Sequence, residues 1–314
     1  ILNLMCTADF WSFVDGDADA RDFSQALAEG AGKFKLAWKG IQVLDNLEED
    51  LGLNPGRAFL DWVSAAMAER GIRTTTDLVT RMRALPPLKD RQDKPLSVDE
   101  ANPNLALVAA DVSTETKVDF PRMAPLYWDS PGGVNPALYV RASMSIPYFF
   151  RPFRIANVPQ GPAAQSNWDH LASYTEAIPN ECVFVDGGIM SNFPIDLFHE
   201  PKKVPLAPTF GAKLGTDHRS HHLIEKPLQL GWAAFQSARH CLDYDFIVRN
   251  PDYRRLITFI DTGEQNWLNF HLSPQERFDL FKRGVEAGAK FLRKFDWTAY
   301  KELRAEIAKV HSIG

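Results

Sequence analysis

The stretch CVFVDGGIMSNFP, from Cys182 to Pro194, constrains the fold more than any other part of the chain. Three apolar β-forming residues run directly into an aspartate and two glycines. A short, uninterrupted apolar run is typical of a strand buried on both faces of a sheet. Asp186 then falls at the carboxyl end of that strand, which is the edge where open α/β sheets bind ligands.

The Asp-Gly-Gly sequence has two interpretations. Asp-Gly is a strong hairpin signal, so a plain turn is one of them. However, the following residues do not alternate like a returning strand, and Ser191 or Asn192 ahead of Pro194 is typical of a helix start. Gly187 and Gly188 permit positive φ and the close approach of another segment. The context favours a strand, an acid, two glycines and a helix, an arrangement suited to an active-site edge.

Composition excludes several classes of protein. The 314 residues are 45% apolar and 24% charged, enough for a sizeable core, and the net charge of -5 without a Lys/Arg run excludes nucleic acid as a partner. No apolar run approaches the roughly 18 residues that an integral membrane segment needs. Cys6, Cys182 and Cys241 are odd in number and far apart, which indicates a reducing compartment, and we expect a cytoplasmic location.

The order of the elements predicts an α/β fold. Helices are expected over 54–71, with Asn54 as N-cap, and from Thr75, followed by a loop over 88–104. Buried strands are expected at 105–111, 182–186, 207–215 and 254–261, with a helix from 135 between the first two. Strands separated by helices predict a mostly parallel sheet covered by helices. We interpret 156–180 as a surface excursion and 1–314 as a single domain.

The clearest helix follows Ser273. Ser273 and Glu276 form a capping box, and Pro274 occupies the first helical position. Apolar residues of this helix share one face at Phe278, Phe281, Val285 and Leu292. Gly284 and Gly288 would permit close packing nearby.

Several stretches together resemble the patatin-like phospholipases. They are RASMSIPYFFRPF (141–153), FVDGGIMSNFPIDLF (184–198), PTFGAKLG (208–215) and NWLNFHLSPQERFDLFKRGVEAGAKFLRKF (266–295), in the order in which the family has them. DFWSFVDGD (9–17) and GRAFLDWVSAAMAERGIRTTTDL (56–78) are similar to its early helical part. The resemblance extends over most of the chain.

This resemblance implies a three-layer α/β domain that cleaves acyl esters of phospholipids or other glycerolipids, at a membrane or micelle surface and without a cofactor. Family members use a serine and an aspartate, with no histidine. The aspartate role transfers to Asp186, which would orient and deprotonate the serine, and Gly187 and Gly188 would shape its turn.

Two elements of that family are not found in the sequence. There is no Gly-x-Ser-x-Gly nucleophile elbow and no glycine-rich oxyanion loop. In the family both precede the region that 1–17 resembles, and the first residue here is Ile1 rather than methionine. We therefore expect an N-terminally incomplete chain that lacks the first strand and the nucleophile helix. Ser143 and Ser145 lack flanking glycines and are poor substitutes.

Other candidate sites are weaker. His218, His221 and His222 in GTDHRSHH match no metal-binding spacing, and no metal is expected. Asp111 ends a strand and either faces the same edge as Asp186 or, as we favour, turns the following STET. The aromatic run at 148–153 indicates core packing more than an acyl pocket. A patatin-fold scaffold without catalysis and an aspartate-dependent metal phosphohydrolase remain the alternative functions.

Overall fold

The computed structural model describes residues 2–28, 49–90, 92–198, 202–215, 252–263, 265 and 268–311, with positions 224, 230, 233, 237, 247, 249 and 250. The chain divides into two compact units. The first comprises 1–89, 95–191 and 266–271, and the second comprises 90–94, 192–265 and 272–314. Both contain helices and strands, which confirms the α/β class. That 1–314 forms a single domain stays a prediction.

The largest sheet belongs to the first unit and has the strand order β5-β4-β8-β7. Its strands are β4 (Leu107–Asp111), β5 (Thr116–Phe120), β7 (Phe153–Ala156) and β8 (Glu181–Asp186). All three pairings are antiparallel, so the expectation of a mostly parallel sheet is wrong here. An apolar run predicts that a strand is buried but carries no information about its direction.

Parallel pairing is confined to two small sheets of the described residues. In the first unit β1 (Gly52–Asn54) pairs with β6 (Tyr148–Phe150). In the second unit β9 (Gly211–Leu214) pairs with β10 (Ile257–Ile260). The loop expected over 88–104 contains the antiparallel pair β2 (Leu88–Lys89) and β3 (Pro95–Leu96) and the short helix α7 (Val98–Ala101).

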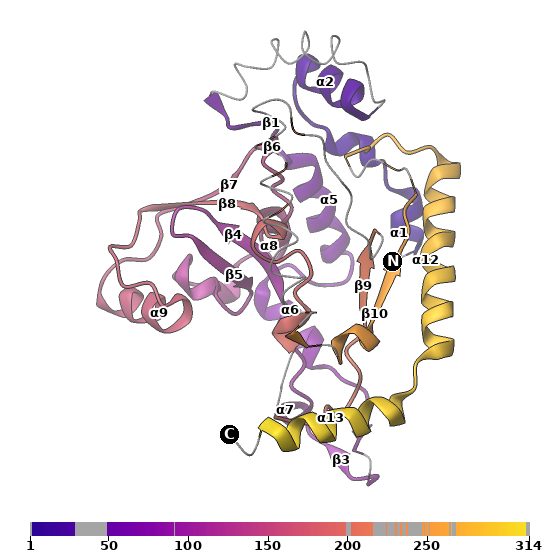
Figure 1. The fold of residues 1–314 in the computed structure, drawn as a ribbon. Helices are drawn as coiled ribbons and strands as arrows, with labels where there is room; N and C mark the ends of the chain where they lie inside the picture. The colour runs from indigo at the N-terminus through magenta and orange to yellow at the C-terminus, as the bar shows by residue number, and fades with distance from the viewer. Residues whose placement is uncertain are drawn as a thin grey trace. The chain divides into compact units, whose positions relative to one another are not determined.

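Besides α7, the first unit contains seven described helices and three short 3-10 turns. They are α1 (Leu2–Thr7), α2 (Ala18–Ala28), α5 (Arg57–Ala68), α6 (Thr75–Arg83), α8 (Ala137–Ser143), α9 (Pro162–Ala172) and α10 (Gly188–Ser191), with 3-10 turns η1 (Phe10–Phe13), η2 (Ala124–Leu126) and η3 (Pro131–Gly133). Among them α8 lies against β4 and β8 (Figure 1). Helix α6 starts at Thr75, as the sequence predicts, and a capping box of Thr74 and Asp77 forms its first turn.

The core of this unit is aromatic. The ring of Phe120 stacks on the ring of Tyr139, with 4.7 Å between the ring centroids. The centroid of the Phe184 ring lies 5.9 Å from that of Phe120. Trp168 of α9 is fully buried against Tyr127 at 5.3 Å. The segment 156–180 is therefore more than a surface excursion, because its helix closes one side of the core.

The second unit is built on the β9–β10 pair. Its other elements are η4 (Ile195–Phe198), η5 (Tyr253–Leu256), α12 (Pro274–Lys294) and α13 (Trp297–His311). The capping box of Ser273 and Glu276 starts α12, as predicted. Helix α12 lies beside β10 (Figure 1). A buried ion pair joins Arg304 to Asp252 at 2.9 Å.

The apolar face predicted for α12 is present but exposed. Phe278, Phe281, Val285 and Leu292 are 48–59% exposed. No described residue comes within 4 Å of a Cβ built on Gly284 or Gly288, so the close packing that these glycines would permit is not seen there. Among the described residues, no helix combines the length and the apolarity needed to cross a membrane.

Replacing Phe120 with alanine tests the aromatic core. We expect Phe120→Ala to lower the free energy of unfolding by about 3–5 kcal/mol, because it removes the ring on which four neighbouring rings pack. The measurement is urea unfolding followed by tryptophan fluorescence. Val112→Ala is the control, since Val112 is 46% exposed, and its effect should stay within about 0.5 kcal/mol. Equal midpoints for the two variants would contradict this core.

Candidate active site

Asp186 is the last residue of β8 and pairs with Ala109 of β4. Its side chain is half-buried, and its Oδ1 accepts a hydrogen bond of 2.6 Å from the backbone N–H of Gly188. The chain then enters α10 instead of a returning strand. A strand, an acid, two glycines and a helix therefore follow one another as predicted, although the helix begins at Gly188, ahead of the start expected at 191 or 192.

The turn after Asp186 requires glycine because of a close backbone approach. A Cβ on Gly187 would lie 1.9 Å from the carbonyl oxygen of Val108 in β4. Neither Gly187 nor Gly188 has positive φ. Gly187 is therefore needed because it has no side chain, and not because of its backbone angles.

The end of α8 holds this turn from the other side. The backbone N–H of Asp186 donates a hydrogen bond of 2.8 Å to the carbonyl oxygen of Ser145. The backbone N–H of Gly187 donates one of 3.1 Å to the carbonyl oxygen of Ser143. The hydroxyl of Ser145 is fully buried, accepts from Nη1 of Arg141 at 2.5 Å and donates to the Arg141 carbonyl at 2.8 Å. These contacts give Ser145 a structural role and leave its hydroxyl unsuited to nucleophilic attack.

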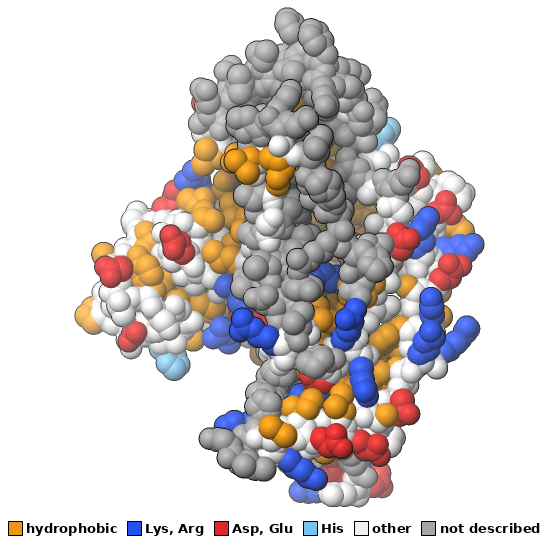
Figure 2. All heavy atoms as spheres, in the orientation of Figure 1, with side chains coloured by type: hydrophobic (Ala, Val, Ile, Leu, Met, Phe, Trp, Pro, Cys, Tyr) orange, Lys and Arg blue, Asp and Glu red, His pale blue; other side chains and the backbone are white. Residues whose placement is uncertain are grey.

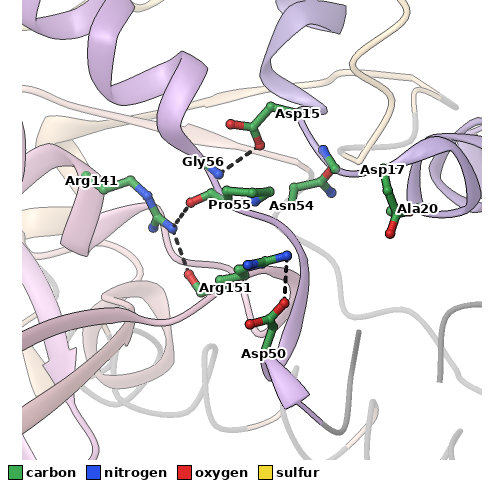
Figure 3. A network of polar contacts seen from close by, with 10 residues as sticks. Asp15, Asp17, Ala20, Asp50, Asn54, Pro55, Gly56, Arg141 and Arg151 are labelled. Atoms are coloured by element: carbon green, nitrogen blue, oxygen red, sulfur yellow. Dashed lines mark hydrogen bonds and ion pairs between the residues drawn. The ribbon is translucent and has the colours of Figure 1, made fainter. Parts of the chain in front are cut away.

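Arg141 is a buried cation that joins three segments. Its Nη2 donates to the carbonyl oxygens of Pro55 and Arg151, both at 2.7 Å (Figure 3). Gly56 adopts positive φ beside it, and a Cβ there would lie 2.6 Å from the Arg141 Nε. Burial lowers the pKa of Arg141 to about 10, against the opposing effect of the Asp15 carboxylate. The guanidinium thus ties α8 to the ends of β1 and β6.

The start of α5 depends on a distant carboxylate. Asp15 accepts a hydrogen bond of 2.8 Å from the N–H of Gly56 (Figure 3). It also accepts from the N–H groups of Arg57 and Ala58, at 2.6 and 2.9 Å. Asn54, predicted as the N-cap, is instead a buried residue of β1, and its side chain bonds to Gly16 and Phe149. The prediction was wrong because this cap comes from about forty residues upstream, where local patterns give no signal.

Asp111 turns the chain, as favoured, and is not an active-site carboxylate. It is fully buried, and its oxygens accept from the Ser113 N–H and the Thr114 hydroxyl, both at 2.9 Å. The Tyr127 hydroxyl also donates to it at 3.1 Å. Burial, with the charge of Asp111, raises the pKa of Tyr127 well above its usual value.

The remaining candidates stand as follows. Phe149 and Phe150 are buried, which confirms core packing for that part of the aromatic run, while Tyr148 is exposed. His218, His221, His222 and Cys241 lie outside the described residues. Among the described residues, no group of three or more His, Cys, Asp or Glu could hold a metal ion. Cys6 is exposed and Cys182 is buried, and no disulfide joins them among the described residues.

Comparison with known proteins agrees with this architecture. The sequence profile of the family described as patatin-like phospholipase matches residues 2–199. The chain is also similar to YqhO, an uncharacterized protein of Bacillus subtilis strain 168, with 26% identity over 250 residues, which cover 79% of this chain and 69% of YqhO.

The first unit thus combines helices with a sheet in which an aspartate ends a central strand. The family match spans more than half of the chain, and the protein belongs to the patatin-like phospholipase family. That Asp186, Gly187 and Gly188 are site residues stays a prediction. Sequence reasoning assigned no role to Arg141 or Asp15, which support the same region. A lone arginine within the apolar helix ALYVRAS was the available signal for Arg141.

Replacing Gly187 with alanine tests the close approach to β4. The new Cβ would overlap the Val108 carbonyl oxygen, so one strand must shift, and we expect a loss of about 1–3 kcal/mol in the free energy of unfolding. Thermal unfolding measures it. Gly133→Ala is the matched control, because no atom of a neighbouring described segment lies within 4 Å of the position that its Cβ would take. An unchanged melting temperature for Gly187→Ala would show that the turn has room for a side chain.

Replacing Arg141 with lysine tests the buried cation. One ammonium cannot reproduce the forked contacts, and each buried carbonyl left unpaired costs about 1–3 kcal/mol. We expect a clear fall in the urea midpoint. Arg122→Lys is the control: its side chain is 52% exposed and pairs with Asp119 at 2.9 Å, so the expected loss is below about 1 kcal/mol. Equal losses would contradict the special role of Arg141.

Proposed function

We propose that this protein is a lipid acyl hydrolase in which Asp186 is the general base of a Ser–Asp dyad. Family membership supports hydrolysis of lipid esters in general. The observation that carries the finer assignment is the position of Asp186, a half-buried carboxylate that ends β8 and is followed by a backbone-packed glycine. The substrates proposed are phospholipids or other glycerolipids, met at a membrane or micelle surface.

In the proposed reaction a serine hydroxyl attacks the carbonyl carbon of the ester and transfers its proton to Asp186. The resulting oxyanion is stabilised by backbone N–H groups, and Asp186 returns the proton to the leaving alcohol. Water then hydrolyses the acyl-enzyme with the same aspartate as base. The Gly188 N–H limits the rotation of the Asp186 carboxylate and so keeps it oriented. This chemistry needs no metal or organic cofactor.

The serine of this dyad is not assigned within the 314 residues, because the sequence contains no Gly-x-Ser-x-Gly. That same observation favours a second candidate, a patatin-fold scaffold or interaction protein without catalysis. The two candidates predict opposite results when lipid hydrolysis is measured. The cytoplasmic location stays part of the proposal and rests on the cysteine pattern.

The test uses the complete gene product that contains these 314 residues, assayed for fatty-acid release from phospholipid vesicles. We expect Asp186→Asn to reduce kcat by about 10²–10⁴-fold, the usual contribution of a general base, with an unchanged melting temperature. Asp169→Asn, which alters an exposed carboxylate of α9, should leave kcat unchanged.

Two results would overturn the proposal. Full turnover by Asp186→Asn would exclude this aspartate as the base. Absence of fatty-acid release by the wild-type protein from any glycerolipid would favour the scaffold.

A further inference from the structure

A cavity of about 780 Å³ lies within the second unit, beside β10 and along α12. This volume is in the range of about 300–1,000 Å³ typical of sites for small ligands. The cavity lies outside residues 2–199, which the family profile matches. Its lining comes from η5, β10, α12 and the start of α13, and it includes the cations Arg254, Arg255, Arg283, Lys290 and Lys294.

Cations dominate one wall of this cavity. Five of its lining residues are Lys or Arg and three are acidic. Arg283, Lys290 and Lys294 recur at i, i+7 and i+11 of α12, a spacing that places them on one face of a helix. On the face drawn in Figure 2, Lys and Arg side chains lie along α12 with hydrophobic atoms exposed beside them.

The acidic residues do not neutralise this wall. The Asp261 carboxylate forms a long ion pair with Arg283, with 3.9 Å between Oδ2 and Nη1. The Glu286 carboxylate lies 3.9 Å from the Nζ of Lys282, a residue outside the lining. Asp296 accepts from the Ala299 N–H at the start of α13. The side chains of Arg255, Lys290 and Lys294 have no ion pair or hydrogen bond with any described residue, so an anionic ligand would meet uncompensated positive charge.

The rest of the lining includes apolar residues. Ile257 and Phe259 come from β10, Phe291 comes from α12, and Phe295 directly follows that helix. The last two rings lie 5.9 Å apart at an interplanar angle of 25°. Phe210 packs edge-on against both, at 5.3 and 4.8 Å, which holds the rings in place.

We propose that this cavity binds a single-chain anionic amphiphile. Its acidic headgroup, a carboxylate or a phosphate, pairs with Lys290, Lys294 and Arg255, and its alkyl chain lies along the phenylalanines of α12 and β10. Charge and shape select this class together: a free anion leaves the apolar wall uncovered, and a neutral amphiphile leaves the cations unpaired. The site does not depend on Asp186 or on hydrolysis.

Isothermal titration calorimetry of the full chain tests the proposal. The probes are dodecanoate and dodecyl phosphate, which distinguish the two headgroups. Inorganic phosphate and dodecyl maltoside are the comparisons, and each amphiphile is used below its critical micelle concentration. At least one of the anionic amphiphiles should bind at least about tenfold more tightly than both comparisons. Equal binding of dodecyl maltoside, or of inorganic phosphate, would overturn the proposal.

Charge-reversal variants locate the site. We expect the double variant Lys290→Glu/Lys294→Glu to weaken binding of the anionic amphiphile by about tenfold, because two headgroup partners become repulsive. Lys282→Glu/Arg293→Glu is the matched control, with the same charge change on the same helix outside the lining. Circular dichroism confirms that both variants fold. Equal weakening by the control would show general electrostatic attraction and refute this site.

Asp186→Asn separates this inference from the proposed hydrolysis. Its affinity for the amphiphile should equal that of the wild type, whether or not fatty-acid release is lost. A loss of binding in this variant would place the ligand elsewhere and contradict the proposal.

Discussion

The close approach of β8 to its neighbours at the Asp-Gly-Gly turn is the constraint on which the candidate site depends. Gly187 lies against the backbone of β4, and the N–H groups of Asp186 and Gly187 donate to carbonyl oxygens at the end of α8. Backbone contacts on both sides leave this turn little freedom. The main chain therefore places the Asp186 carboxylate, and the N–H of Gly188 helps to orient it.

Arg141 extends this constraint outward. The residue supports the end of α8 through Ser145 and reaches the carbonyls of Pro55 and Arg151. A buried guanidinium with several acceptors is costly to remove, because each acceptor then loses its partner. Asp15 completes the same region by capping α5. Residues distant from Asp186 in sequence thus determine how firmly its turn is held.

The second unit adds chemistry that the family resemblance does not describe. Helix α12 exposes the apolar side chains of Phe278, Phe281, Val285 and Leu292. The same helix carries Arg283, Lys290 and Lys294, which line the cavity beside β10. Separating charge and apolar surface on one helix suits it to amphiphilic ligands. If the proposed hydrolysis and the proposed site both hold, one chain would release and retain molecules of the same chemical class.

The sequence alone determined what depends on neighbours along the chain. The Ser273–Glu276 capping box, the helix start near Thr75, the strand end at Asp186 and the helix after it follow from local patterns. The capping bonds join residues only three positions apart, and an apolar run followed by an acid and glycines marks where a strand ends. Only the tertiary structure decided the antiparallel direction of the main sheet, the cap that Asp15 supplies and the acceptors of Arg141. These join segments tens of residues apart, and burial specifies that such groups need partners without specifying which ones.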